Sequence, residues 1–486
     1  NSGEGEGEGE GEGEGEGEGE GEGEGEGEGE GEGEGEGEGE GEGENYSPCG
    51  DKPKAWTGDL CGNQENPCKL LINEMISDEP AFRNDAPSVA VSPTGEPHVL
   101  YTVAETPPSG ILESRDSNGI WSSHKLPTDV IRGSLILSEE NLPTMLIYGG
   151  SASDVQLFQF KPAGWLKMEN VSMVSGAWAG SMAGDSSGCF HATALMANNS
   201  VNYALRVLGI DAMWGWLFST VSEVGTSQAG VAPLALSESG DPHMLFWQSE
   251  INSGTGTSGW HLFWSAPPMA TEKVLSLGSS DIDMVEQYPF ITVTGPKYDG
   301  ETGTPHILSV RAPQDAQSTE MMVYATRTES GTWESHEIVV LYPPENTSCP
   351  EPQYDGEPCV YQTVINRPLG IVSSGSGSVR FFYANIETHG HLTAVCSSGS
   401  GSQPMCTWEV TDNNVDWKVV YRRIYVGWPT ETGIDTFDVL VEAGQEIGPL
   451  TATAVLGPEG RIHMATYVQV DDSNSNVHYL EIGPAP

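Results

Sequence analysis

The chain has 486 residues, of which 71 are acidic and only 20 are basic, and its formal net charge at neutral pH is −51. This balance argues against nucleic acids and anionic membrane surfaces as partners, because both are bound through clustered lysine and arginine side chains. No apolar run approaches the length of about 18 residues that a transmembrane helix needs.

The first feature along the chain is a tract of twenty-one consecutive Gly-Glu dipeptides at residues 3–44. It has no apolar side chain to bury and its carboxylates repel one another, so we assign residues 1–45 to a disordered polyanionic spacer. A cation sponge or a docking strip for a basic partner is the alternative interpretation. We expect the spacer to hold the rest of the chain away from an anchor upstream of Asn1, for example a lipid.

Residues 46–84 form a lead-in that carries Cys49, Cys61 and Cys68 and one strand-like run, residues 69–76. Cys189 is a distant partner for this group, and the pairing among these four cysteines is left open. No cysteine or histidine spacing matches a zinc site. An even number of cysteines with such spacing predicts a disulfide-bonded protein outside the cytoplasm.

Two further cysteine pairs bracket turn-rich loops, Cys349 with Cys359 and Cys396 with Cys406. Each pair closes a short loop, so we predict the disulfides Cys349–Cys359 and Cys396–Cys406. Both support an extracellular or cell-surface location.

From residue 85 the sequence repeats seven times. Each unit opens with a short strand of small and apolar residues, at 87–92, 133–138, 180–184, 232–237, 288–293, 367–373 and 448–456. A turn, a second strand, a third strand and a tryptophan-led fourth strand follow in most units. Period-2 apolar runs between Gly, Ser, Asn and Asp turns are typical of antiparallel strands. We therefore predict an all-β fold in which residues 85–486 form a seven-bladed β-propeller of four-stranded antiparallel blades.

The seventh unit ends without a fourth strand. The run at 69–76 can supply it, which would join the two ends of the repeat region and cover an exposed sheet edge.

Five of the seven second strands begin with a histidine after a turn, as in "GEPHVLYT" at 95–102; these histidines are His98, His191, His243, His306 and His463. Thr144 and Arg380 take this place in the second and sixth units. A metal-binding ring is disfavoured, because equivalent positions on seven blades lie around a circle while coordination needs three or four ligands at one ion. We expect each histidine to be satisfied by backbone of a neighbouring blade.

The turns "SRDSNGIW" at 114–121 and "TRTESGTW" at 326–333 resemble the Asp-box turns of bacterial neuraminidase-repeat propellers. The region 85–482 is similar to propellers of secreted bacterial proteins, often lipoproteins with low-complexity spacers. In this chain the glycine lies one place later than in the usual motif, at Gly119 and Gly331, and only the first copy keeps an aspartate, Asp116. The resemblance implies a fold and no activity.

No residue emerges as catalytic. A sialidase-like hydrolase would need three arginines around a substrate carboxylate with a Tyr/Glu pair and an acidic proton donor. The chain offers Arg115 and Arg327, but they occupy the same repeat position on different blades, which indicates a structural role.

The candidate ligand-binding residues are tryptophans of the third and fourth units, which could stack on sugar rings or aromatic partners. They are Trp214, Trp216, Trp247, Trp260 and Trp264. Packing between blades is the alternative role for them.

The weak metal candidates are His389 and His391, two residues apart, and Asp471 and Asp472, which could hold calcium. No cofactor is expected. The sequence favours an extracellular binding or assembly module for a protein or glycan ligand, presented on an acidic stalk. A carbohydrate-active hydrolase or lyase, and a structural subunit of a surface layer or filament, are the alternatives.

Overall fold

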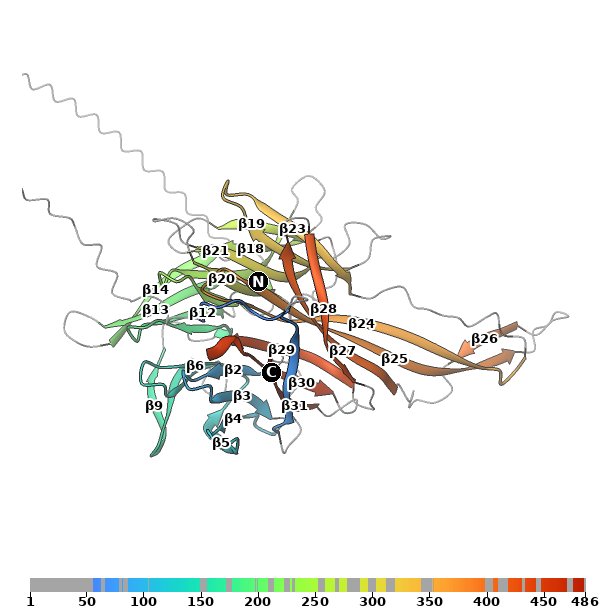
Figure 1. Ribbon diagram of the computed structural model, residues 1–486, viewed down its shortest axis with the longest axis horizontal. Helices are drawn as coiled ribbons and strands as arrows, with labels where there is room; N and C mark the ends of the chain where they lie inside the picture. The colour runs from blue at the N-terminus through green and yellow to red at the C-terminus, as the bar shows by residue number, and fades with distance from the viewer. Residues whose placement is uncertain are drawn as a thin grey trace, which may run out of the picture. The chain divides into compact units, whose positions relative to one another are not determined.

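A computed structural model gives the arrangement of the chain (Figure 1). The residues that the structure describes are 56–62, 66–77, 81, 86–103, 105–148, 155–171, 177–196, 198, 200–208, 214–222, 228–229, 232–251, 258–266, 271–277, 289–295, 303–311, 320–341, 352, 354–397, 405–409, 418–430, 433–442, 447–469 and 475–484. The Gly-Glu tract lies outside them, and the predicted domain boundaries at residues 45 and 84 stay predictions.

The described strands form seven antiparallel sheets, numbered here in chain order. Sheet one holds β2 (Ser88–Val91), β3 (Pro97–Val103), β4 (Ser109–Arg115) and β5 (Trp121–Asp129), and sheet two holds β6 (Arg132–Leu137), β7 (Pro143–Tyr148), β8 (Gln156–Lys161) and β9 (Gly164–Asn170). Sheet three holds β10 (Ala177–Ala179), β11 (Met182–Gly184), β12 (Phe190–Met196), β13 (Val201–Leu208) and β14 (Trp214–Ser222), and sheet four holds β15 (Gln228–Ala229), β16 (Leu234–Leu236), β17 (Pro242–Ile251), β18 (Ser258–Ser265) and β19 (Glu272–Leu277). Sheet five holds β20 (Pro289–Thr294), β21 (Thr304–Arg311), β22 (Met321–Arg327) and β23 (Trp333–Val340). Sheet six holds β24 (Pro358–Ser373), β25 (Val379–Ser397), β26 (Met405–Glu409), β27 (Lys418–Thr430) and β28 (Gly433–Glu442), and sheet seven holds β29 (Ile447–Leu456), β30 (Ile462–Gln469), β31 (Ser475–Pro484) and β1 (Cys68–Met75).

One strand from each sheet contacts a strand of the next sheet, and these contacts form a closed circle. β2 contacts β6, and the contacts continue through β11, β16, β20, β24 and β29 back to β2. Clusters of buried apolar side chains lie between neighbouring sheets, for example Leu146 and Leu157 of sheet two with Phe190 and Ala192 of sheet three. The predicted all-β propeller architecture of antiparallel sheets is confirmed. Among the described residues the one helical segment is a single 3-10 turn, η3 (Pro458–Gly460).

Sheet seven is completed from the other end of the chain. β1 pairs antiparallel with β31, with Lys69 opposite Gly483 and Glu74 opposite Tyr479, so the order across the sheet is β1-β31-β30-β29. The run at 69–76 therefore occupies the outer position that the seventh repeat leaves open.

The repeated turn before each second strand is a tight hairpin. In sheet one the amide of Ser92 donates to the carbonyl of Glu96 and that of Gly95 to the carbonyl of Ser92, and Gly95 has φ of +88°. Glycine adopts this left-handed conformation without the steric cost of a Cβ. Sheet two has Asn141 at the same place with φ of +58°, and asparagine is among the residues that tolerate it best.

The repeated histidines bond to side chains on the next strand of the same sheet. Nδ1 lies 2.7 Å from Tyr203 Oη in His191, 2.6 Å from Tyr324 Oη in His306 and 2.6 Å from Tyr479 Oη in His463. His98 bonds to Ser114 and His243 to Trp264 in the same way. The expected partner, backbone of a neighbouring blade, was wrong for these nitrogens. The tyrosines lie on the third strand, two residues from the position directly opposite each histidine, and their long side chains reach the ring along that diagonal. The histidine thus ties the second strand to the third.

Arg380 replaces the histidine in sheet six and holds the lead-in. Its Nε donates to the carbonyl of Cys61 at 2.6 Å and its Nη2 to the carbonyl of Leu60 at 3.0 Å. The amide of Gly375, in the preceding turn, donates to the carbonyl of Trp56 at 2.8 Å. Burial lowers the pKa of Arg380, and Asp59 partly offsets this effect.

For two disulfides the structure describes both cysteines. Cys61 and Cys68 are joined immediately before β1, and Cys396–Cys406 joins β25 to β26, as predicted. Cys359 and Cys189 are disulfide-bonded as well, whereas Cys349 and Cys49 lie outside the described residues. The Cys349–Cys359 pairing remains a prediction. Within the described part of the chain, no helix is long and apolar enough to cross a membrane.

Candidate functional site

The five predicted tryptophans divide between core and rim. Trp247, Trp260 and Trp264 are at most 5% exposed and pack between sheets four and five. Their burial favours the alternative role, packing between blades, because β17 and β18 are inner strands of a sheet covered on both faces. Trp214 is 39% exposed and Trp216 is half-buried, both on the outer strand β14. These two remain candidates.

The predicted metal ligands stay predictions. His389 and His391 lie on β25, where their backbones pair with β24, but their side chains are not described. Asp471 and Asp472 lie outside the described residues. Among the residues that the structure does describe, no group of three metal-ligating side chains comes together.

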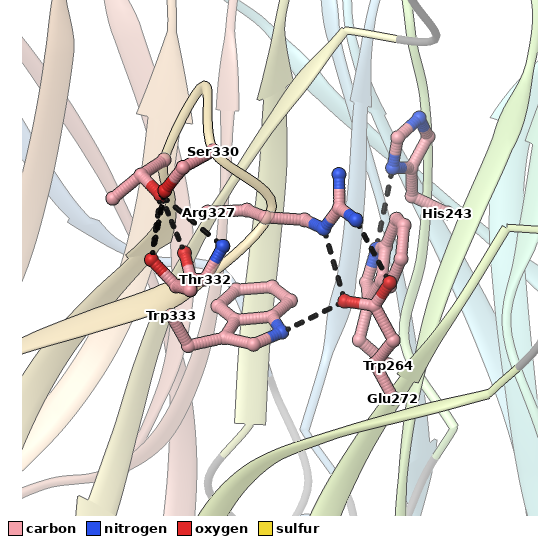
Figure 2. A network of polar contacts seen from close by, with 8 residues as sticks. His243, Trp264, Glu272, Arg327, Ser330, Thr332 and Trp333 are labelled. Atoms are coloured by element: carbon pink, nitrogen blue, oxygen red, sulfur yellow. Dashed lines mark hydrogen bonds and ion pairs between the residues drawn. The ribbon is translucent and has the colours of Figure 1, made fainter.

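A polar cluster that the sequence did not reveal lies between sheets four and five (Figure 2). Arg327, the last residue of β22, donates from Nε and Nη2 to the two carboxylate oxygens of Glu272 on β19, at 2.9 and 2.8 Å. Trp333, the first residue of β23, donates from Nε1 to the same carboxylate at 3.2 Å. One carboxylate therefore orients a guanidinium and an indole of the next sheet.

The inner side of this cluster is closed. The rings of Trp333 and Trp264 meet edge to face, with centroids 5.7 Å apart, and Trp264 Nε1 lies 3.3 Å from Nδ1 of the buried His243. The outer side is open, since the Arg327 and Glu272 side chains are 32% and 33% exposed. The cluster is thus anchored in the core and reaches solvent.

A second copy lies between sheets seven and one. Arg115 Nη2 is 3.3 Å from one oxygen of Glu74, and Trp121 Nε1 donates to the other at 2.8 Å. Trp121 meets Tyr479 edge to face at 5.2 Å, and Tyr479 bonds to His463. Tyrosine here takes the place that Trp264 has in the first cluster.

A third copy lies between sheets two and three. Arg206 forms an ion pair with Glu169 on β9, and its guanidinium lies 4.5 Å from the ring centre of Trp214 and 5.3 Å from that of Phe190. Trp216 is opposite Arg206 across β13 and β14, as Trp333 is opposite Arg327, but its Nε1 is buried without a hydrogen-bond partner. The predicted candidate Trp214 lies two residues before Trp216 and contacts the same arginine through its ring.

The first two clusters follow from one local arrangement. The third strand ends at an arginine, a tight turn follows, and a tryptophan begins the fourth strand, so both side chains reach the same edge of the sheet. The glutamate comes from the outer strand of the preceding sheet. It is far from the arginine in the sequence, so no short sequence motif contains both residues. The assignment of Arg115 and Arg327 to a structural role agrees with their ion pairs.

The described tyrosine–glutamate pairs are closed to solvent. Tyr479 Oη lies 3.4 Å from Glu481, and Tyr101 Oη lies 3.3 Å from Glu113, but all four side chains are buried. Burial raises the pKa of the Tyr479 hydroxyl, with the Glu481 charge acting in the same direction. A buried phenol whose ionisation is disfavoured cannot act as a nucleophile on a polymer.

Burial also affects the repeated histidines. It lowers the pKa of His98 to about 4, against an opposing effect of Glu96, and that of His463 to about 4, against an opposing effect of Glu481. Both rings are therefore neutral near pH 7, which suits hydrogen bonding to hydroxyl groups.

Chemically, the cluster of Arg327, Glu272 and Trp333 is suited to binding. It presents a guanidinium, a carboxylate and an aromatic ring at a sheet boundary, with hydrogen-bonding groups beside an apolar face (Figure 2). Such a combination recognises ligands that have hydroxyl groups next to an apolar surface.

No family model and no curated protein matches this sequence. Among solved structures, the chain is similar to the polysaccharide lyase Uly1, with 9% identity and a TM-score of 0.50, over 86% of this chain and 99% of that one. It is also similar to a protein of unknown function from Dyadobacter fermentans DSM 18053, with 11% identity and a TM-score of 0.40 over 86% and 99%. A neuraminidase-like protein of subtype N11 from A/flat-faced bat/Peru/033/2010 matches with 8% identity and a TM-score of 0.35, over 90% and 97%. At 9% identity the likeness to Uly1 shows the fold alone.

Proposed function

We propose that the protein is an extracellular binding module whose ligand contacts aromatic side chains at the rim of the propeller. The observation that carries this proposal is the position of Trp214, an indole that is 39% exposed yet held against the guanidinium of Arg206. Exposed tryptophan is uncommon on a surface without a partner and is enriched at recognition sites.

An extracellular location is supported by the disulfides Cys61–Cys68 and Cys396–Cys406, since such bonds persist in oxidising compartments. The strong negative charge of the chain favours solubility and disfavours binding to anionic surfaces.

The test is a combined glycan and protein array probed with the full chain and with Trp214→Ala. We expect binding to at least one ligand, and weaker binding by the variant at unchanged melting temperature. Full-chain protein that binds nothing on either array would contradict the proposal.

A carbohydrate-active lyase or hydrolase is the second candidate. The similar structure of a polysaccharide lyase favours it, although at 9% identity that likeness concerns the fold. Glu320, the residue immediately before β22, is the candidate acid: one of its carboxylate oxygens is buried without a hydrogen-bond partner, and burial raises its pKa. A raised pKa is the direction of change that a general acid requires.

This candidate predicts turnover of a chromogenic glycoside, or an ultraviolet-absorbing unsaturated product from a uronate polysaccharide. Such activity should be lost in Glu320→Gln. Activity that persists in this variant would remove Glu320 from the candidate mechanism, and no turnover in the panel would leave the binding module as the better reading.

A further inference from the structure

We propose that the cluster of Arg327, Glu272 and Trp333 is a subsite for a neutral sugar ring. The inference rests on the proposed binding function and gives it a ligand class and a location. It is a different location from the Trp214 surface used above.

The aromatic platform of this subsite is already rigid. The Trp333 indole is fixed by its hydrogen bond to Glu272 and by its edge-to-face contact with the buried Trp264. A platform that is immobile before binding loses little side-chain entropy when a ligand packs on it. The C–H face of a sugar ring is the ligand surface that matches a partly exposed indole of this kind.

Hydrogen-bonding capacity remains beside the platform. Two of the three guanidinium nitrogens of Arg327 bond to Glu272, and the third, Nη1, points away from that carboxylate in Figure 2. The turn between Arg327 and Trp333 carries three hydroxyl groups, with Thr328 Oγ1 2.8 Å from both Ser330 Oγ and Thr332 Oγ1. Hydroxyl groups donate and accept, as the adjacent hydroxyls of a sugar do.

The charges favour a neutral sugar over an acidic one. The bidentate pair of Arg327 and Glu272 has no net charge, so Arg327 is not a free cation that could hold a carboxylate or sulfate. The chain as a whole is strongly negative and repels anionic polysaccharides. Uronates and sialic acids are therefore expected to bind more weakly than neutral glycans.

Two other tryptophans provide matched comparisons, because each lies at the start of the fourth strand of its sheet: Trp121 is the first residue of β5 and Trp165 the second of β9. Trp165 has no arginine–glutamate pair, and its Nε1 donates to the carbonyl of Lys125 at 2.8 Å. Trp121 has the pair, but its turn carries Asp116, whose Oδ1 accepts from the amides of Asn118 and Ile120 at 2.9 and 2.8 Å. Trp165→Ala should leave binding unchanged, and Trp121→Ala should have a smaller effect than Trp333→Ala.

The experiment is affinity electrophoresis of the full chain in native gels containing xylan, arabinan, galactomannan or starch, with polygalacturonate as the acidic comparison. We expect retardation by at least one neutral polysaccharide and none by polygalacturonate. Trp333→Ala should weaken that retardation about tenfold. The double variant Ser330→Ala/Thr332→Ala changes only exposed turn hydroxyls and should weaken it by a smaller factor at unchanged melting temperature.

The outcomes separate this inference from the binding function. If the wild-type chain binds a neutral polysaccharide and both the Trp333 and the turn variants bind equally well, the subsite is wrong and the binding function stands. Preferential retardation by polygalacturonate would overturn the choice of neutral sugars. If the Trp333→Ala chain does not fold, the Ser330→Ala/Thr332→Ala variant becomes the test. Unchanged binding by that double variant would count against the subsite. If the wild-type chain binds none of these polysaccharides, the subsite is wrong. The glycan and protein arrays then test the binding function independently.

Discussion

The side chain of Arg380 donates a 2.6 Å hydrogen bond to the main-chain carbonyl of Cys61, which is 319 residues away in the sequence. The same guanidinium reaches the carbonyl of Leu60 and lies over the ring of Trp428. One residue of sheet six therefore fixes the segment that leads into β1, the outer strand of sheet seven.

Replacing Arg380 by alanine should destabilise the fold by about 2–4 kcal/mol, because two buried carbonyl groups would lose their partner. Urea unfolding measures the change. The control is Arg311→Ala, which removes an exposed ion pair with Glu337 and should cost no more than about 0.5 kcal/mol. Equal effects of the two substitutions would show that Arg380 does not hold the lead-in.

The Cys61–Cys68 disulfide acts on the same segment. Both cysteines are buried, so alanine at both positions avoids leaving a polar atom without a partner. The loop-entropy model gives a loss of about 2–3 kcal/mol for a loop of this length. In the double alanine variant, amide hydrogen exchange should become faster than in the wild-type chain, and the increase should be larger in β1 than in β20–β23. Uniform protection across both regions would contradict a local role for the disulfide.

Stability should fall as the pH drops from about 6.5 to about 4. The pKa values of His98 and His463 are lowered to about 4 in the folded protein, so in this window the unfolded chain binds protons that the folded protein does not. Each histidine changes the free energy of unfolding by roughly 3 kcal/mol across this window: the stabilisation is present above pH 6.5 and is lost by pH 4. The measurement is the free energy of unfolding against pH. His463→Gln should remove part of the slope, and an unchanged slope would refute the assignment.

The tryptophans at the core and at the rim should respond differently to truncation. Trp247 is fully buried, so Trp247→Ala should cost about 3–5 kcal/mol through the cavity it leaves. Trp214→Ala, at the rim, should cost less than about 1.5 kcal/mol, since much of its ring already faces solvent. Thermal unfolding of the two variants checks this order. A larger loss for Trp214 would mean that its role is packing.

The strands were predictable from the sequence because each repeat carries its own turn signals and apolar alternation. The first strand predicted at 133–138 is observed at Arg132–Leu137, and that at 448–456 is observed at Ile447–Leu456. The placement of β1 was predictable for another reason. A four-stranded repeat that ends after three strands leaves one edge open, and only one strand-like run was left to fill it.

The candidate site was less predictable. Arg327 and Trp333 are visible as parts of a turn motif, but Glu272 is 55 residues before Arg327 and has no local signature. Burial of Trp247 and Trp264 also could not be read from the sequence, because an aromatic residue on a strand gives the same pattern in the core and at the rim. Which face is covered depends on the neighbouring sheet, and that is a property of the assembled ring.

The pairing of β1 with β31 has a consequence for synthesis of the chain. Asn73 and His478, which bond across these two strands, are 405 residues apart, so a ribosome has made almost all of the repeats before β1 can meet its partner. Until β31 is made, the backbone N–H and C=O groups of β1 have no partner strand. We expect nascent chains that stop before β31 to need a chaperone, or to associate with one another through that edge, while full-length chains do neither.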